Sequence, residues 1–286
     1  IPAIDALIEL AANEKDVKEV VIGMAHRGRL NMLINILGKN LQDVFSEFDG
    51  KDYENPEFDG DVKYHLGLTS LRTTTKGKEV LLNLAPNPSH LETVASVLEG
   101  IARAKQDIHY ADKPSQVLPI VIHGDAAVAG QGIVYEVMQM ERLEGYTTHG
   151  TVHVVINNQI GSTTNPSDSR STTYCTDIAK GFQAPVLHVN SDDTEAVVRA
   201  FLFALDYRMT FGTDVFIDVI GYRKYGHNEG DEPRFTQPSL YKLIGTHKNP
   251  TVIYTEKLVN QGVITPKEIE AYEENYRNHL DTELEA

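Results

Sequence analysis

The sequence lacks most of the features that mark a secreted or membrane protein. It holds one cysteine, Cys175, in 286 residues, which excludes an intramolecular disulfide framework and fits a reducing cytoplasm. No apolar run approaches the ~20 residues needed to span a bilayer, and no basic start followed by an apolar segment indicates a signal peptide. We therefore expect a globular cytoplasmic protein that is not embedded in a membrane.

Basic residues are scarce beside acidic ones. Lys and Arg number 26 against 41 Asp and Glu, which gives a formal net charge of −15. Nucleic acids and anionic membrane surfaces both select basic faces, so neither is expected as a partner. Such an acidic chain also repels phosphate. If it binds a phosphorylated ligand, we expect a cation such as magnesium and local basic side chains beside it.

The chain begins without methionine and enters an amphipathic helical pattern within its first residues. We expect residues 1–286 to form a single domain of a longer chain. Residues 48–62 are rich in Asp, Glu, Gly and Pro, which predicts an exposed acidic loop. Residues 250–286 are predicted to form peripheral helices, one of which starts with Pro266 at its first position.

Apolar runs of strand length, rich in Val and Ile, alternate with helical patterns along the chain. Such runs are typical of strands buried on both faces, and helices between them indicate right-handed crossovers. The sequence therefore predicts an α/β fold, a doubly wound, mainly parallel sheet with helices on both faces. The expected strands are residues 19–24, 80–84, 118–123, 152–156, 186–189 and 215–220, and the expected helices are residues 3–12, 29–37, 91–104, 133–143, 194–207 and 266–278.

Two polar pairs, Gly124-Asp125 and Asn157-Asn158, each end an apolar strand-like run. Ligands of open α/β sheets bind beyond the carboxyl ends of the strands. Carboxylate and carboxamide oxygens suit magnesium, which prefers an octahedron of oxygen ligands. The two pairs resemble the motif with which thiamine-diphosphate enzymes hold magnesium and the cofactor's diphosphate. On spacing alone, two strand ends with ordinary polar caps explain these residues about equally well.

Polar residues follow other expected strands too. His26 and Arg27 come after the first strand, His227 comes after the last, and His65 follows the acidic loop. Arginine can bind phosphate or carboxylate with two parallel hydrogen bonds, and histidine carries protons near neutral pH. Each residue alone has a common structural explanation, such as a surface ion pair or a packed ring. Their gathering at one edge of the sheet favours a binding site.

Some of the polar residues are expected to serve the fold. Ser89 and Glu92 have the spacing of a capping box, so Ser89 is predicted to be the N-cap of the following helix, which leaves an active-site role open. His153 and His188 lie within strand-like runs and are interpreted as packed side chains.

Seven segments occur in a consistent order and cover nearly all of the chain: residues 23–31 (GMAHRGRLN), 63–67 (KYHLG), 87–92 (NPSHLE), 123–127 (HGDAA), 150–161 (GTVHVVINNQIG), 188–193 (HVNSDD) and 226–229 (GHNE). Together they resemble the decarboxylating component of 2-oxoglutarate dehydrogenase. Seven ordered motifs are far more specific than one short pattern. Ser162 departs from the family, which often carries an aromatic residue there.

The resemblance implies two cofactors, thiamine diphosphate and Mg²⁺. The metal ligands would be the carboxylate of Asp125, the side-chain oxygen of Asn158 and the backbone carbonyl of Ile160. Substrate binding and proton handling would fall to His26, His65 and His227. The other implied cofactor contacts are Arg27, Ser89, Leu91, Ala126 and Ala127.

The resemblance also implies an activity and partners. The reaction would be oxidative decarboxylation of 2-oxoglutarate, with succinyl transfer to the lipoyl domain of a dihydrolipoyl succinyltransferase. Enzymes of this family use a second, pyrimidine-binding domain, in the same or a second chain and usually across a homodimer interface. No such domain fits within 286 residues, so this chain alone is expected to lack full activity. A eukaryotic member would work in the mitochondrial matrix.

Three alternatives stay open. A 2-oxoadipate dehydrogenase component differs only by one methylene in its substrate, which typically discriminates by ~1–3 kcal/mol. A Rossmann-type nucleotide-binding module would need a Gly-x-Gly-x-x-Gly turn and an acid about 20 residues later, and the sequence shows neither. A non-catalytic interaction domain is the third, because a fold alone never fixes a function.

Overall fold

The computed structural model describes residues 1–48 and 64–285. Its strands form one sheet in the order β2-β3-β1-β4-β5-β7-β6. All neighbouring strands are parallel except β2 and β3, which run antiparallel. The predicted α/β fold with a mainly parallel sheet is therefore confirmed. The strands are β1 (Glu19–Met24), β2 (Leu68–Thr73), β3 (Glu79–Leu84), β4 (Val117–Gly124), β5 (Val152–Asn157), β6 (Val186–Asn190) and β7 (Val215–Ile220).

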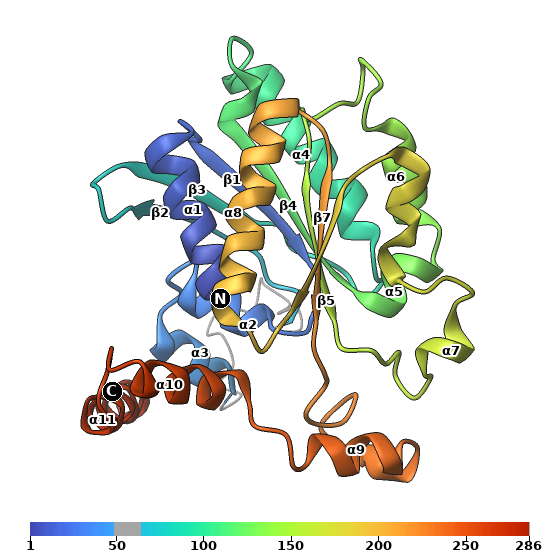
Figure 1. Cartoon of the computed structure of the whole chain (residues 1–286). Helices are drawn as coiled ribbons and strands as arrows, with labels where there is room; N and C mark the ends of the chain where they lie inside the picture. Colours follow the sequence, from blue (N-terminus) through green and yellow to red (C-terminus); the bar gives the residue numbers. More distant parts are fainter. Residues whose placement is uncertain (49–63, 286) are drawn as a thin grey trace, which may run out of the picture.

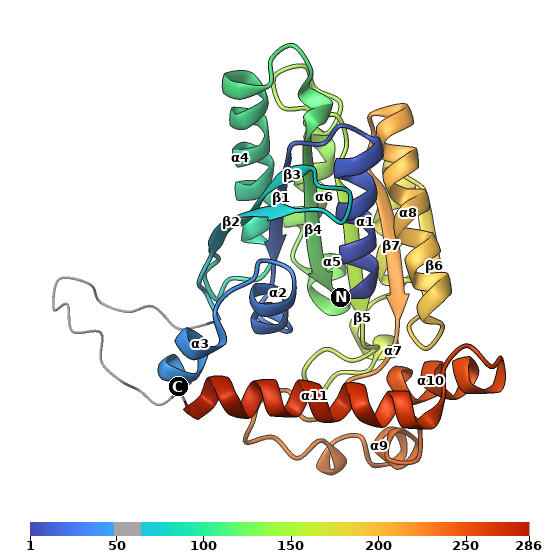
Figure 2. The same cartoon turned by 90° about the vertical axis from the view of Figure 1, so that its left-hand side faces the viewer.

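Helices cover both faces of this sheet, as Figures 1 and 2 show. On one face lie α1 (Pro2–Glu14) and α8 (Thr194–Phe211), with α2 (Arg29–Asn35) beside them. On the other face lie α4 (Thr93–His109), α5 (Asp125–Gly130) and α6 (Ile133–Met140). The central strands are thus buried on both sides, which is why they are nearly continuous apolar runs in the sequence.

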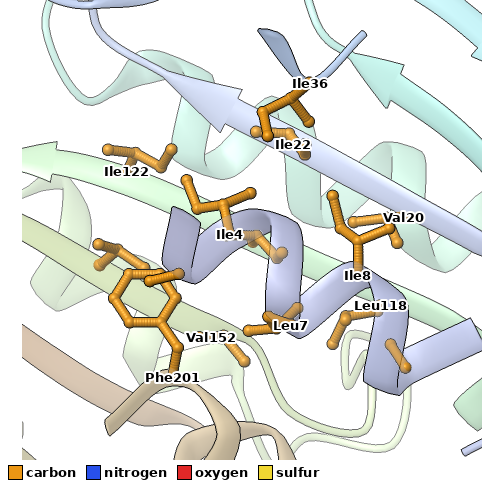
Figure 3. Close-up of a cluster of buried hydrophobic side chains, with 14 of the residues drawn as sticks. Ile4, Leu7, Ile8, Val20, Ile22, Ile36, Leu118, Ile122, Val152 and Phe201 are labelled. Atoms are coloured by element: carbon orange, nitrogen blue, oxygen red, sulfur yellow. The ribbon is translucent and has the colours of Figure 1, made fainter. Parts of the chain in front are cut away.

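The core on the α1 side is built by a helical apolar stripe. Ile4, Leu7 and Ile8 lie on one face of α1 because residues three and four apart share a helix face, and they pack over Val20 of β1 and Leu118 of β4 (Figure 3). All five are buried. Burying one such side chain stabilises the fold by roughly 1.5–3 kcal/mol, so this face makes a large contribution to the stability of the core.

The sheet has a topological switch point at β1. From β1 the chain builds β3 on one side, then crosses back to place β4 on the other side. Connections that leave adjacent strands in opposite directions open a crevice beyond their carboxyl ends, which is where open α/β sheets bind ligands. The residues after β1 and after β4 therefore face the place at which the fold favours a site.

Short helices lie beyond the carboxyl end of the sheet, where β4 and β7 stop (Figures 1 and 2). They are α3 (Leu41–Phe48), α7 (Pro166–Ser169), α9 (Pro238–Ile244) and α10 (Pro250–Asn260), together with the longer α11 (Pro266–Glu285). Elsewhere along the chain, 3₁₀ turns are formed by η1 (Pro114–Gln116), η2 (Cys175–Phe182) and η3 (Pro233–Phe235). None of the residues of α10 and α11, all of which the structure describes, is buried. Among the described residues no helix is both long and apolar enough to traverse a bilayer.

Several sequence expectations need correction. β2 and α3 were not predicted, and Phe48 ends α3 rather than starting a loop. The rest of the predicted acidic loop, residues 49–62, lies outside the described residues. The predicted cap of α4 is wrong: the helix starts at Thr93, after Glu92 in a left-handed conformation, and Ser89 does not cap it. Glu92 instead turns inward to bond His123.

Candidate active site

A cavity of about 1900 Å³ opens beyond the carboxyl ends of the strands. Segments from four strand ends form its wall: those after β1, β4, β5 and β7. The predicted site residues that line it are His26, Arg27, Leu91, Asp125, Ala126, Ala127, Asn158, Ile160 and His227. The structure therefore brings together nine residues that span 201 positions of the chain. His65 and Ser89 are not part of the lining and lie next to it.

Asp125 and Asn158 are adjacent, as the proposed common cation requires. Both follow neighbouring parallel strands, and the Asn158 backbone N–H donates to Asp125 Oδ1 at 3.3 Å. The Asp125 side chain is buried, and that burial raises its pKa above the usual value, an effect that Asp218 reinforces. A carboxylate in this environment gains most from a bound cation, because the cation favours the charged form that burial disfavours.

The turn after β5 presses against the start of α5. A Cβ on Gly161 would come within 2.8 Å of the Ala126 Cβ, so each position accepts only a small side chain. Asn158 Oδ1 accepts from the Ile160 backbone N–H at 3.2 Å, which holds the turn in shape. This packing explains why alanine suits position 126, and it keeps Ile160 in the cavity wall.

Two histidine rings lie in tilted contact at the β1 side. The ring centroids of His26 and His65 are 5.0 Å apart, and His65 Nε2 lies 3.1 Å from Ser89 Oγ. Burial, then the neighbouring His65 and Arg29, lowers the pKa of His26, although a hydrogen bond to the Pro88 backbone opposes this. His26 is therefore neutral at neutral pH, and its buried Nε2 has no partner among the described residues.

Arg27 and His227 connect the β1 and β7 sides of the cavity. Arg27 Nη2 donates to the His227 carbonyl at 3.1 Å, and Asp231 Oδ2 accepts from the His227 backbone N–H at 2.8 Å. The loop is tight, since a Cβ on Gly226 would collide with the Asp231 backbone. His227 thus reaches the cavity from a segment whose backbone is fixed on both sides.

Arg27 and Arg29, in the turn after β1, have different roles. Arg29 is fully buried and donates to the carbonyls of Met24, Leu66 and Ala85 at 2.7–3.1 Å. It therefore holds the turn in place. Burial lowers the pKa of Arg29 to about 10. Arg27, two residues earlier, keeps most of its donors for the cavity.

Sequence reasoning missed a buried polar chain beneath the cavity. Glu92 Oε2 lies 2.6 Å from His123 Nδ1, His123 Nε2 lies 2.9 Å from His153 Nδ1, and His153 Nε2 lies 3.1 Å from Asp214 Oδ2. All four side chains are buried. His153 was correctly interpreted as packed, but the same interpretation of His188 is wrong: His188 is exposed, and its Nδ1 lies 2.8 Å from Asp218 Oδ2. Histidines inside apolar strands, offset by two register positions on the neighbouring strands β4 and β5, were the only sequence signal for this buried polar chain.

The site fits a magnesium-held diphosphate by its donor set. In residues 1–48 and 64–285, no three His, Cys, Asp or Glu side chains gather around one point. A metal here would rely on one carboxylate with amide and carbonyl oxygens, which are the ligands magnesium accepts. The unpartnered Nε2 of His26 also points to a polar ligand. The residues present therefore suit the cofactor pair that the sequence implied.

The α/β fold and the polar residues at the carboxyl ends of its strands together define a domain of the thiamine-diphosphate-binding class. The chain belongs to the dehydrogenase E1 component family, whose model matches residues 1–286. It is 51% identical over 282 residues to the 2-oxoglutarate dehydrogenase E1 component of Azotobacter vinelandii, covering 98% of this chain and 30% of that protein. The protein of the same name from Haemophilus influenzae is 51% identical over 271 residues, covering 94% and 29%.

A eukaryotic relative matches as well. The protein named "2-oxoglutarate dehydrogenase, mitochondrial" from Schizosaccharomyces pombe is 49% identical over 289 residues, covering 100% of this chain and 28% of that protein. The chain thus spans under a third of the length of these curated relatives. The predicted resemblance to this family is confirmed.

Proposed function

We propose that this chain supplies the magnesium–diphosphate half of the site of a thiamine-diphosphate-dependent 2-oxoglutarate dehydrogenase. One observation carries the proposal. Asp125 Oδ1 and the Asn158 backbone N–H lie 3.3 Å apart at the carboxyl edge of the sheet, beyond the ends of β4 and β5. The family membership supports the same reading. It also makes a dinucleotide-binding Rossmann module or a purely structural domain poorer explanations of this edge.

The chain's own residues would hold the cofactors as follows. Asp125 and Asn158 would ligate Mg²⁺ through side-chain oxygens, and Ile160 through its carbonyl. Ser89 and Leu91 would contact the rest of the cofactor, while Ala126 and Ala127 leave room for its phosphates. Arg27 would pair with a phosphate or carboxylate oxygen, because its guanidinium suits planar anions.

When bound, thiamine diphosphate supplies the carbon nucleophile and the electron sink for decarboxylation of a 2-oxo acid. The histidines would bind the substrate and move protons around it. His26 is neutral because burial lowers its pKa, so its free Nε2 can accept a proton or a hydrogen bond. His65, oriented by Ser89, and His227 would face the same substrate from two sides.

The remainder of the reaction needs parts that these residues do not contain. We propose a pyrimidine-binding domain, in the same or a second chain of a homodimer, as the other half of the site. The product acyl group, succinyl, would pass to the lipoyl domain of a dihydrolipoyl succinyltransferase. Residues 1–286 would act as one cofactor-binding domain, in the bacterial cytoplasm or the mitochondrial matrix. A 2-oxoadipate substrate is the second candidate, and competition kinetics between the two acids would decide.

The metal site is tested by titrating the purified protein with thiamine diphosphate at several magnesium concentrations. We expect magnesium-dependent binding that Asp125→Ala weakens by more than about 100-fold, because even outer-shell residues cost 10–100-fold. Asp112→Ala, an exposed aspartate far from the cavity lining, is the matched control and should bind normally. Binding that ignores magnesium, or an unaffected Asp125→Ala variant, would refute the proposal.

A further inference from the structure

Arg223 is a buried cation in the wall of the cavity. Its side chain is 5% exposed and lines the space between the β5 and β7 ends. Nε donates to the Tyr225 carbonyl at 3.1 Å and to the Tyr241 hydroxyl at 3.0 Å, and Nη1 donates to the Ser162 carbonyl at 2.9 Å. Its Nη2 is buried and has no partner among the described residues. A buried, unpartnered charged donor costs free energy, so a ligand that supplies an acceptor would gain from it.

A second cation lies close to Arg223. Arg27 lines the same cavity, and burial, followed by the charge of Arg223, lowers the pKa of Arg27. In the described part of the chain, neither arginine forms an ion pair with a carboxylate, although most other arginines with short contacts do. Two positive charges in one cavity wall, neither of them ion-paired among the described residues, are stabilised when an anion binds between them.

We propose that Arg223 is a second cation of an oxyanion site, which it forms with Arg27 inside this cavity. The ligand is an anionic oxygen, from a diphosphate or from the carboxylate of a dicarboxylic 2-oxo acid. This choice of ligands rests on the proposed function. Arg223 has further importance for position, since it joins the turn after β5 to the segment that carries His227.

Arg223 has two roles that mutation can separate. One is the clamp, the set of hydrogen bonds by which it holds the turn after β5 against the segment that carries His227, and the other is its positive charge. Tyr241 accepts from Arg223 Nε and donates to the Tyr225 carbonyl at 2.9 Å, so Tyr241→Phe weakens the clamp and leaves the charge. Arg223→Lys keeps a charge but loses the planar fork. Arg223→Gln loses the charge and keeps part of the hydrogen bonding. Comparison of the three variants therefore separates the effect of the Arg223 charge from the effect of its positioning hydrogen bonds.

Affinity is measured by calorimetry on the purified protein, with two separate probes: inorganic diphosphate with magnesium, and 2-oxoglutarate alone. Losing a hydrogen bond to a charged group weakens binding by about 10- to 100-fold, and we expect this loss in Arg223→Gln for at least one probe. Arg223→Lys should lose less, and Tyr241→Phe about threefold at most. A loss with diphosphate alone assigns the oxyanion to phosphate, and a loss with 2-oxoglutarate alone assigns it to a carboxylate.

The outcomes separate this inference from the proposed function. Unchanged affinity for both probes in Arg223→Gln, or in Arg223→Lys should the Gln variant not fold, would overturn the inference. So would a loss in Tyr241→Phe as large as in the arginine variants, since that would mean a purely structural clamp. Diphosphate binding that needs no magnesium and survives Asp125→Asn would defeat the proposed function, while the graded series would still support the oxyanion site. A wild-type protein that binds neither probe would overturn both.

Discussion

Two buried aspartates sit at opposite ends of the sheet. Asp125 follows β4 at the carboxyl edge and is 3% exposed, and Asp214 precedes β7 at the amino edge and is 4% exposed. Burial raises the pKa of both. Asp214 Oδ1 accepts a short hydrogen bond of 2.7 Å from the Thr151 backbone N–H, and its Oδ2 lies 3.1 Å from His153 Nε2. Asp125 lines a cavity and accepts a longer bond of 3.3 Å.

The contrast shows that burial of an acid does not by itself mark a functional site. A sealed, hydrogen-bonded carboxyl belongs to the architecture of the core, while a buried carboxyl that faces open space keeps oxygen lone pairs for a ligand. The same contrast separates Arg29, which is held by three backbone carbonyls, from Arg223, whose Nη2 has no partner in the part of the chain that the structure describes. Variants at the amino edge of the sheet should therefore lose stability, and variants at the carboxyl edge should lose ligand affinity.

The largest expected difference is in stability, at the sealed end. Asp214→Ala leaves the buried Thr151 N–H without an acceptor and deprives His153 of its partner, so we expect a loss of about 3 kcal/mol in the free energy of unfolding. Denaturant titration measures it, and the affinity for magnesium should not change. The comparison breaks if Asp214→Ala weakens magnesium-dependent cofactor binding as strongly as Asp125→Ala does, while the fold stays intact.

A smaller effect should appear as a pH dependence of stability. Glu99 lies beside Asp214 and accepts from the Thr148 and Thr151 hydroxyls at 2.8 and 2.7 Å. Burial and then the charge of Asp214 raise the pKa of Glu99 from 4.5 to about 7. The folded chain thus holds a proton at pH values where the unfolded chain has lost it. The contribution of Glu99 to stability is therefore fully present below about pH 4.5 and is lost as the pH rises to about 7, by at most ~1.4 kcal/mol per pH unit for one proton.

Urea unfolding at pH 5, 6 and 7 tests this sign. Glu99→Gln keeps an oxygen acceptor for one threonine hydroxyl, can donate its amide N–H to the other, and cannot ionise, so its stability should vary less with pH than that of the wild type. Glu144→Gln, on an exposed turn, is the control and should keep the wild-type slope. A wild-type stability that rises between pH 5 and 7 in step with Glu99→Gln would show that the Glu99 carboxyl does not hold this proton.

Much of the fold could be predicted from the sequence, because strands that are buried on both faces form recognisable apolar runs. The runs around Val20, Leu118 and Val152 are mainly apolar, and each forms a strand within one or two residues of the expected bounds. The edge strand β2 escaped because it is covered on one side only, so its residues alternate between half-buried and exposed, and Leu71 is 61% exposed. An edge strand carries a weaker signal than a central one.

The candidate site was readable for a related reason. Parallel strands put their carboxyl ends at one edge, so the residues after each run were candidates without any knowledge of contacts. Glu92 shows where such reasoning ends. Its spacing from Ser89 favoured a capping box, but the buried His123 offers a 2.6 Å partner, and this tertiary contact outweighs the local one. Arg223 was not among the predicted site residues, because the Tyr241 and Ser162 groups that hold it lie 18 and 61 positions away in the sequence.

The smallest predicted effect lies at the open end. Ser89→Ala removes the 3.1 Å contact between Ser89 Oγ and His65 Nε2, which is exposed. An exposed hydrogen bond contributes about 0.5–1.5 kcal/mol, so affinity for the 2-oxo acid should fall by about 2- to 10-fold while the free energy of unfolding hardly changes. Ser96→Ala, whose Oγ bonds only within α4 at 2.9 Å, is the control. If Ser89→Ala instead lowered stability and left substrate affinity intact, the His65–Ser89 pair would belong with Asp214 among the parts that hold the fold, and the division between the two ends of the sheet would have to be redrawn.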